Sequence, residues 1–315
     1  MIPVAFDYLR PSTVEDAIAA LTDAGDEGKV IAGGQSLLPV LRLRLAAPSV
    51  LVDLGGMPQL RGVRDEGDAI VIGAMTTHDE VCSSPVVVEH APLLAQAART
   101  VGDRQVRHRG TLGGSVSHGD PASDLPAVLL ALDATFVVRG PGGSRDIPAS
   151  EFFNGFLETA LALDASYVLA GPNGRRTISA KEFAVDLFTT ALEANEVLVE
   201  VRVPKLPGWG AHYEKFHRTA QAWSIVAVAA TVQRSNGAIG SARVALTNMG
   251  PTAVRATQLE EALAGCAANA EAIAAACAVA DQGAAPADDL TATADYRRHL
   301  VRVLAARAVQ AAAGV

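Results

Sequence analysis

Two glycine-rich segments hold the residues of this chain that are best suited to bind a ligand. The first is Ile31-Ala32-Gly33-Gly34-Gln35-Ser36-Leu37, and the second is Gly110-Thr111-Leu112-Gly113-Gly114-Ser115. A Gly-Gly pair lacks two Cβ atoms, so its backbone can take a positive φ and approach a ligand closely. Consecutive N–H groups in such a turn attract an anion, and a neighbouring serine hydroxyl adds a donor. Two loops of this kind could hold a pyrophosphate from two sides.

Asp124 closes the polar stretch that follows the second loop, and its carboxylate could accept hydrogen bonds from ribose or ribityl hydroxyls.

Neither loop fits the G-x-G-x-x-G or Walker A pattern, which excludes a standard Rossmann or P-loop site. Either loop alone is better explained as an ordinary turn. There are two such loops, each after an apolar residue and each followed by a serine. An anion or nucleotide site therefore explains the pair about as well as ordinary turns do.

The elements around these loops indicate an α+β protein. A short strand over Lys29–Ala32 leads into the first loop, and a helix over Leu37–Leu45 follows it. An earlier helix is capped by Ser12 or Thr13, and the helical pattern between Thr77 and Val101 is broken at Pro85 and Pro92. The helix expected over Leu125–Leu132 comes directly after the second loop.

A domain boundary is expected at Pro204-Lys205-Leu206-Pro207, after a strand over Glu196–Val203. Strand-like segments follow, and Asn236-Gly237 between two of them is a strong hairpin signal. Helices complete the chain from Arg255 onward. We therefore predict domains 1–207 and 208–315. In the last helix, Arg297, Arg298, Arg302 and Arg307 are expected to form one solvated side.

Residues 132–161 and 163–192 resemble each other at an offset of 31. Leu132-Asp133-Ala134 matches Leu163-Asp164-Ala165, and Gly140-Pro141 matches Gly171-Pro172. Each copy predicts a strand, a Gly-Pro turn and a short helix. Two copies do not make a solenoid, so we expect a tandem duplication in which one copy extends a sheet edge or forms a surface excursion.

The composition narrows the class of protein. The chain has 315 residues and a net charge of −8, which argues against a general nucleic-acid binder. No apolar run has the length of a bilayer span, and the first ten residues do not form a secretory signal, so a cytoplasmic location is expected. The three cysteines, Cys82, Cys266 and Cys277, are too scattered for a disulfide framework or a metal site, and we expect them to be structural.

The two loops resemble those of the FAD-binding subunits of molybdenum hydroxylases, and the medium subunit of aerobic carbon monoxide dehydrogenase is the nearest type. The segments that carry the resemblance are Ala32 to Leu37, Arg109 to Ser115, Ile2-Pro3, Phe6-Asp7-Tyr8, Arg10-Pro11, Gly73 to His78, Asp120-Pro121 and Asp124 to Ala127. The resemblance covers nearly the whole chain. It implies an FAD-binding domain of the vanillyl-alcohol-oxidase (PCMH) type with two subdomains, about 1–55 and 56–207, and a small C-terminal three-stranded antiparallel sheet with helices.

By the same resemblance, non-covalently bound FAD would lie between the domains. The cofactor-binding residues carried over by position are Ala32, Gly33, Gly34, Gln35, Ser36 and Leu37 in the first loop, Thr111, Gly113, Gly114, Ser115, Ser117 and His118 in and after the second, and Asp124, Lys215 and Trp223. Ser115 stands where many relatives have Asn, and Trp223 where some have Tyr. The repeat lengthens the chain beyond the family norm and contains no cysteine, so no additional iron–sulfur cluster is expected in it.

Other polar residues have competing interpretations. His78, His108 and His118 could act in acid–base or metal chemistry, but structural or cofactor-contacting positions explain them better. Asp120 and Asp124 could be paired acids, but helix capping and cofactor hydroxyls are simpler explanations. The arginines of segment 104–109 could face a subunit, a phosphate or solvent. Trp223 and Lys215 could equally be a core residue and an exposed strand lysine.

The resemblance implies an electron-transfer subunit without catalytic or metal-binding residues of its own. A large partner would carry molybdopterin and a small partner [2Fe-2S] clusters, in a dimer of heterotrimers. FAD would pass the electrons to a quinone, NAD or oxygen, with peripheral association with a membrane acceptor left open. The alternatives are a stand-alone flavin oxidase or reductase and a non-catalytic nucleotide-binding protein. The sequence names neither the substrate nor the acceptor.

Overall fold

The computed structural model describes residues 2–153, 166–171, 174–179 and 190–315. It begins with a small parallel sheet of β1 (Asp7–Leu9), β3 (Val50–Asp53) and β2 (Gly28–Ile31), in that spatial order. Helix α1 (Val14–Ala24) packs on this sheet through a stripe that includes Val14, Ile18 and Leu21. The Thr13 side chain caps α1 by accepting from the Asp16 N–H at 3.1 Å, as one of the two predicted caps.

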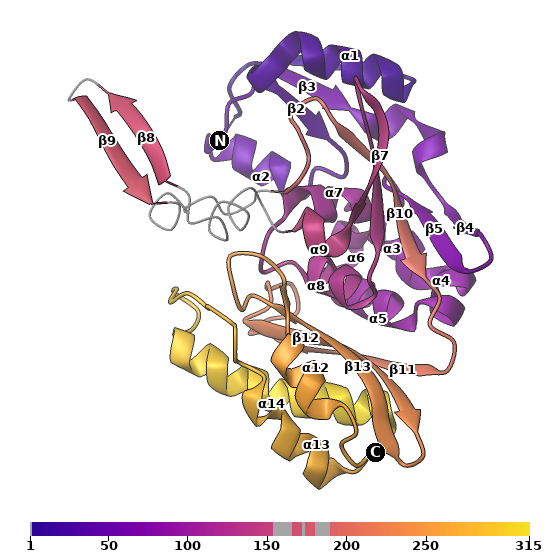
Figure 1. Cartoon of the computed structure of the whole chain (residues 1–315). Helices are drawn as coiled ribbons and strands as arrows, with labels where there is room; N and C mark the ends of the chain where they lie inside the picture. The colour runs from indigo at the N-terminus through magenta and orange to yellow at the C-terminus, as the bar shows by residue number, and fades with distance from the viewer. Residues whose placement is uncertain (1, 154–165, 172–173, 180–189) are drawn as a thin grey trace.

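A five-stranded antiparallel sheet forms the middle of the molecule (Figure 1). Its order is β4 (Val63–Asp65), β5 (Ala69–Gly73), β10 (Val197–Pro204), β6 (Thr135–Gly140) and β7 (Gly143–Pro148). Among the described residues, the helices of this part are α3 (His78–Ser83), α4 (Pro85–His90), α5 (Pro92–Thr100), α6 (Arg104–Arg107), α7 (Leu112–His118), α8 (Asp124–Ala131) and α9 (Ala149–Phe152). The predicted breaks at Pro85 and Pro92 are confirmed, since each proline begins a new helix.

The C-terminal sheet consists of β11 (Trp209–Phe216), β12 (Val226–Ser235), β13 (Ala238–Thr247) and β14 (Val254–Arg255). Three strands were expected; the fourth is a two-residue edge strand, too short for a sequence pattern to reveal. The hairpin at Asn236-Gly237 is confirmed, with φ of 50° and 79° at its two residues. Helices α12 (Thr257–Leu263), α13 (Ala270–Ala276) and α14 (Ala294–Ala313) complete this part.

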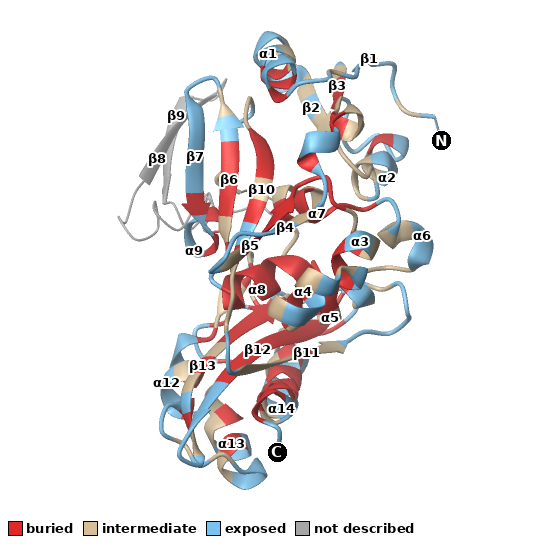
Figure 2. Ribbon diagram, turned by 90° about the vertical axis from the view of Figure 1, so that its right-hand side faces the viewer, coloured by how far each residue is buried: buried red, intermediate tan, exposed pale blue. Residues whose placement is uncertain are grey.

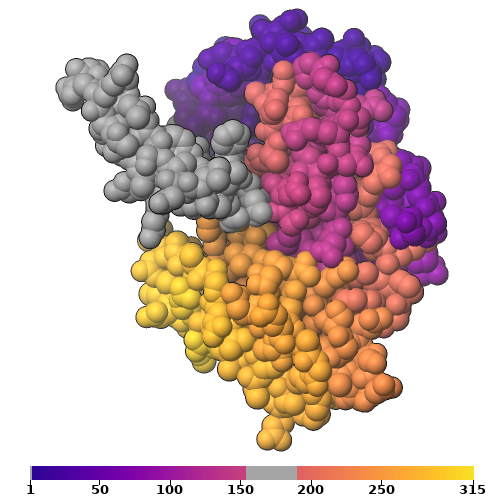
Figure 3. Space-filling model, in the orientation of Figure 1, coloured from indigo at the N-terminus to yellow at the C-terminus, as the bar shows by residue number. Residues whose placement is uncertain are grey.

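Strand β12 is buried on both faces, which explains why it reads as a continuous apolar run. Val226, Val228 and Ala230 pack in the C-terminal core with α14, whereas Ala227 and Ala229 pack with α8 and α5 of the middle part (Figure 2). The predicted boundary at 207/208 falls between β10 and β11. Across it the orange C-terminal part adjoins the magenta middle part directly (Figure 3).

The prediction that Arg297 lies on a solvated side of the last helix is wrong. Arg297 is 1% exposed and falls in register with Val301 and Leu304 on the buried stripe of α14. Its two terminal nitrogens have partners there, since Nη1 donates to the carbonyl of Ile225 and Nη2 donates to Asp289 and Thr291, whereas the buried Nε has none. Arg302 instead pairs with Asp281 at 2.7 Å near the surface.

The two repeat copies form hairpins with the same register but occupy different places. In the first copy β6 pairs with β7 from Thr135–Pro148 to Gly140–Gly143. In the second, β8 (Ser166–Gly171) pairs with β9 (Gly174–Ser179) from Ser166–Ser179 to Gly171–Gly174. Only the first hairpin joins the five-stranded sheet, with β7 at its edge, and β8 and β9 form a sheet of their own that stands apart (Figure 1). The copies are therefore not in equivalent core positions, and the predicted short helix of the second copy lies outside the described residues.

Candidate functional site

The two glycine segments, almost eighty positions apart in the chain, touch each other in the fold. A Cβ added to Gly33 would lie 2.2 Å from the carbonyl oxygen of Arg109 and 2.7 Å from Cα of Gly110. Both are backbone atoms and cannot turn away. Glycine at position 33 is therefore what allows the two segments to meet, as a shared ligand site requires.

The first segment is a turn between β2 and α2 (Leu37–Arg42), and it leaves donors unused. Gly34 has a φ of 75°, a conformation that glycine adopts at little cost. Among the described residues, the amide N–H groups of positions 33–36 have no hydrogen-bond acceptor. Successive unpaired N–H groups in a turn are a favourable site for an anion, so this segment fits the diphosphate of a nucleotide cofactor.

The second segment forms the first turn of a helix. The prediction that both glycine segments are similar open loops is therefore corrected. The Thr111 hydroxyl caps α7 by accepting from the N–H of Gly114 at 3.1 Å. The N–H groups of Leu112 and Gly113 donate to the carbonyls of Thr76 and Ala74, both at 2.9 Å. A Cβ on Gly113 would lie 2.5 Å from that of Ala74. The glycine here serves helix packing more than ligand contact.

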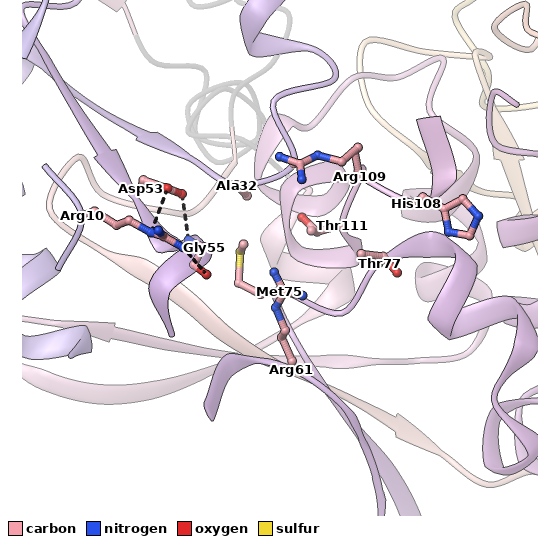
Figure 4. A pocket seen from close by; sticks show the side chains of 11 residues that line it. Arg10, Ala32, Asp53, Gly55, Arg61, Met75, Thr77, His108, Arg109 and Thr111 are labelled. Carbon is pink, nitrogen blue, oxygen red and sulfur yellow. Dashed lines mark hydrogen bonds and ion pairs between the residues drawn. The ribbon is translucent and has the colours of Figure 1, made fainter. Parts of the chain in front are cut away.

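A cavity of about 170 Å³ opens where the segments meet (Figure 4). Ala32, Gly33 and Thr111 line it, and they are the predicted cofactor residues that the fold gathers there. The remaining walls include three arginines, Arg10, Arg61 and Arg109, together with Asp53, Gly55, Met75, Thr77 and His108. Arg10 and Arg61 were not predicted, because no local pattern links them to the glycine segments and only the fold brings them near.

Ser115, Ser117 and His118 lie along α7, away from the walls of this cavity. The hydroxyl of Ser115 is 2.8 Å from that of Ser123, which ties α7 to the turn before α8. Burial lowers the pKa of the half-buried His118, and the neighbouring Asp120 carboxylate partly opposes this. The imidazole is therefore mainly neutral at pH 7.

Asp124 and Lys215 form a buried ion pair between the middle and C-terminal parts. The Lys215 ammonium lies 2.7 Å from the Asp124 carboxylate, and the two side chains are 4% and 7% exposed. The hydroxyls of Tyr213 and Ser224 also donate to Asp124, each at 2.7 Å. Burial raises the pKa of Tyr213 well above its usual value, so the phenol remains a donor. In this structure the contacts of Asp124 connect the middle part to the C-terminal part.

Trp223 lies in the segment between β11 and β12 and is 54% exposed, so it is not a core residue. Nearby in the chain, His217 and Ala220 line a second cavity of about 440 Å³ with Arg99, Thr100, Gly102, Asp103, Arg104 and Arg107. The arginine cluster of segment 104–109 is thus divided, with Arg109 at the first cavity and Arg104 and Arg107 at the second.

His78 is a buried residue that contacts the second glycine segment. It is 4% exposed, its N–H donates to the carbonyl of Gly110 at 2.9 Å, and its Nδ1 has no partner. Burial lowers its pKa to about 4, with a smaller contribution from the charge of Arg107. A neutral buried imidazole with one unpaired nitrogen is a packing residue, and within the described residues no group of His, Cys, Asp and Glu could hold a metal ion.

Two family models together match almost the whole chain. One, the FAD binding domain in molybdopterin dehydrogenase, matches residues 4–162 and, in a second overlapping match, 156–206. The other, the CO dehydrogenase flavoprotein C-terminal domain, matches residues 211–312.

Individual proteins are similar over the same length. The chain is 40% identical to the carbon monoxide dehydrogenase medium chain of Hydrogenophaga pseudoflava, covering 99% of this chain and 98% of that one. A solved carbon monoxide dehydrogenase from Hydrogenophaga pseudoflava, which lacks the Mo-pyranopterin moiety, matches with a TM-score of 0.87 at 41% identity, covering 99% and 98%. Quinoline 2-oxidoreductase from Pseudomonas putida 86 matches with a TM-score of 0.86 at 30% identity, covering 100% and 99%.

Proposed function

The chain belongs to the family of FAD-binding medium subunits of molybdenum hydroxylases, and from this premise we propose which of its residues hold the cofactor. It is the flavoprotein component of an oxidoreductase complex, and it transfers electrons through FAD. Bound FAD supplies the redox chemistry, while the chain supplies binding, orientation and protection from solvent. Molybdopterin belongs to a partner subunit.

The observation that carries the assignment of residues is the contact between the two glycine segments. We place the FAD diphosphate where Gly33 meets Gly110, with the unpaired N–H groups of 33–36 as its donors. The cavity of about 170 Å³ is smaller than the roughly 300–1,000 Å³ of pockets that enclose a whole ligand. It therefore fits one part of the cofactor rather than all of it.

For the flavin end we propose the region of Lys215 and Trp223, as the family resemblance implies. The indole of Trp223 is exposed and can cover a ring face, because it is not part of the protein core. Lys215 is held by Asp124 and by the carbonyl of Thr100 at 3.2 Å, so its ammonium is fixed in place. Asp124, with Tyr213, Lys215 and Ser224 on its oxygens, acts in this proposal mainly by holding Lys215.

The relatives are subunits of multi-subunit complexes. We propose that this chain assembles with a large molybdopterin subunit and a small iron–sulfur subunit as a cytoplasmic dimer of heterotrimers. No helix within the described residues is long and apolar enough to cross a membrane. One solved relative is named for carbon monoxide and another for quinoline. Chains similar to this one thus occur in complexes named for different substrates, and we propose that the partner that carries the molybdenum sets the substrate.

Adding a single methyl group at Gly33 tests whether the diphosphate binds where the two segments meet. Gly33→Ala would place a Cβ against the backbone of Arg109 and separate the two segments. We expect the complex that contains this variant to retain less than about a tenth of the wild-type FAD, a loss of at least roughly 1.4 kcal/mol in binding. Released flavin, measured per chain after denaturation, is the readout. Gly142→Ala is the matched control, because a Cβ there meets nothing within 4 Å. Full FAD occupancy of Gly33→Ala would show that the diphosphate lies elsewhere.

A further inference from the structure

Three guanidinium groups converge on the cavity where the glycine segments meet. Figure 4 shows Arg10, Arg61 and Arg109 around it, each from a different segment. Arg10 follows β1 of the small parallel sheet, Arg61 precedes β4 of the five-stranded sheet, and Arg109 precedes α7. The cavity thus has walls from both subdomains of the FAD-binding part.

In the part of the chain that the structure describes, Arg10 is the one of these three cations with a carboxylate partner. Arg10 lies 3.5 Å from Asp53 and donates to the carbonyl of Gly55 at 3.3 Å. Within the described residues, no carboxylate lies within 4 Å of the guanidinium of Arg61 or Arg109. Among the lining residues, three arginines and one carboxylate, Asp53, together contribute a net charge of about +2 to the cavity wall. This surplus is unusual in a chain whose net charge is −8.

We propose that Arg10, Arg61 and Arg109 are the residues that neutralise the diphosphate of the cofactor, and that the anion joins the two subdomains across this cavity. The inference rests on the proposed function. A diphosphate diester carries two negative charges at neutral pH, which matches the surplus on the wall. The N–H groups of 33–36 supply directed hydrogen bonds, and the guanidinium groups supply the charge. Because all three arginines are exposed, they are available to a ligand and contribute little to the fold without one.

The test measures ligand binding and stability separately. Flavin-free full-length protein is heated with inorganic pyrophosphate, with ADP or with adenosine. A ligand that binds only the folded chain raises Tm. We expect pyrophosphate and ADP to raise Tm and adenosine to leave it unchanged. Arg61→Gln and Arg109→Gln should keep the wild-type Tm without ligand and weaken pyrophosphate and FAD binding about tenfold each. Arg202→Gln, an exposed arginine on β10 away from the cavity, should change neither.

The outcomes separate the two claims. If wild-type protein takes FAD and the Arg61 and Arg109 variants bind FAD and pyrophosphate equally well, the arginine assignment is wrong and the proposed function stands. If pyrophosphate raises Tm through these arginines but the complex holds no FAD, the anion site stands and the proposed function fails. A lower Tm of the flavin-free variants would show a structural role instead and overturn the inference.

Discussion

The contacts of Asp124 in the fold differ from those that its sequence position indicates. Its carboxylate accepts from Tyr213, Lys215 and Ser224, all from beyond the predicted domain boundary. A carboxylate beside glycine segments is an obvious partner for cofactor hydroxyls, and that is how the sequence presents it. The fold instead gives it a cation and two hydroxyls of the protein. The sequence could not reveal this, because the partners lie about ninety to a hundred positions away.

The buried pair leads to a prediction at this residue. Lys215→Met removes the cation and leaves Asp124 buried without a countercharge. Breaking a buried pair on one side costs roughly 3–5 kcal/mol. Urea unfolding of the variant should show a loss of about this size. The double variant Asp124→Asn/Lys215→Met, which removes both charges, should recover part of it. If Lys215→Met is as stable as wild type, the pair does not hold the domains together.

His78 predicts a dependence of stability on pH. Its pKa falls from 6.5 in the unfolded chain to about 4 in the fold, because burial disfavours the charged imidazole. The unfolded chain therefore binds a proton more readily between these values, and the stability present above pH 6.5 is lost as pH falls toward 4. The loss from this residue is at most roughly 3 kcal/mol. His78→Leu should flatten that part of the pH profile of Tm, and an unchanged slope would contradict the assignment.

At the scale of elements, the repeat is the main departure from a simple family fold. The first copy supplies the hairpin of the five-stranded sheet. The end of the second copy supplies the segment that leads into β10. Ala191 donates to the carbonyl of Phe152 at 3.0 Å, and Arg145 donates to the carbonyl of Ala191 at 2.8 Å. Thr190-Ala191-Leu192 is the counterpart of Thr159-Ala160-Leu161. The FAD-domain model accordingly matches the chain twice, overlapping at 156–162.

Deleting residues 159–189 should therefore leave a functional single-copy chain. It joins Glu158 to Thr190 and keeps β6, β7 and the contact at Ala191. A long insertion costs a fold little, so its removal changes little. We expect wild-type FAD content in the complex and a Tm within a few degrees. Loss of folding or of FAD would show that the second copy is part of the working structure.

The opposite deletion, of residues 132–162, is a sharper test of the same idea. The second copy has Tyr167, Leu169, Ile178 and Phe183 where the first has the buried Phe136, Val138, Ile147 and Phe152. It has Ala184, however, for the buried Phe153, whose ring lies 5.5 Å from that of Phe136. Loss of a core phenylalanine costs roughly 3–5 kcal/mol. This chain should fold with a clearly lower Tm, and failure to fold would show that the copies are not interchangeable.

For the whole molecule, the sequence predicted those features that depend on local patterns or on family resemblance. Proline and Asn-Gly signals placed helix starts and a hairpin, and the glycine segments pointed to the place where they meet. The convergence of Arg10 and Arg61 on that place depends on two sheets packing together, which no short pattern encodes. The buried position of Arg297 was visible in its register with Val301 and Leu304, but its partners lie on other segments.

The central claim is that this chain holds FAD for an electron-transferring complex. The most direct test is the visible absorption spectrum of the chain purified with its partner subunits, with the released chromophore identified by mass. We predict a flavin spectrum and intact, non-covalently bound FAD, one per chain. A complex that assembles normally but is free of flavin, and that takes up none when FAD is added, would contradict the account.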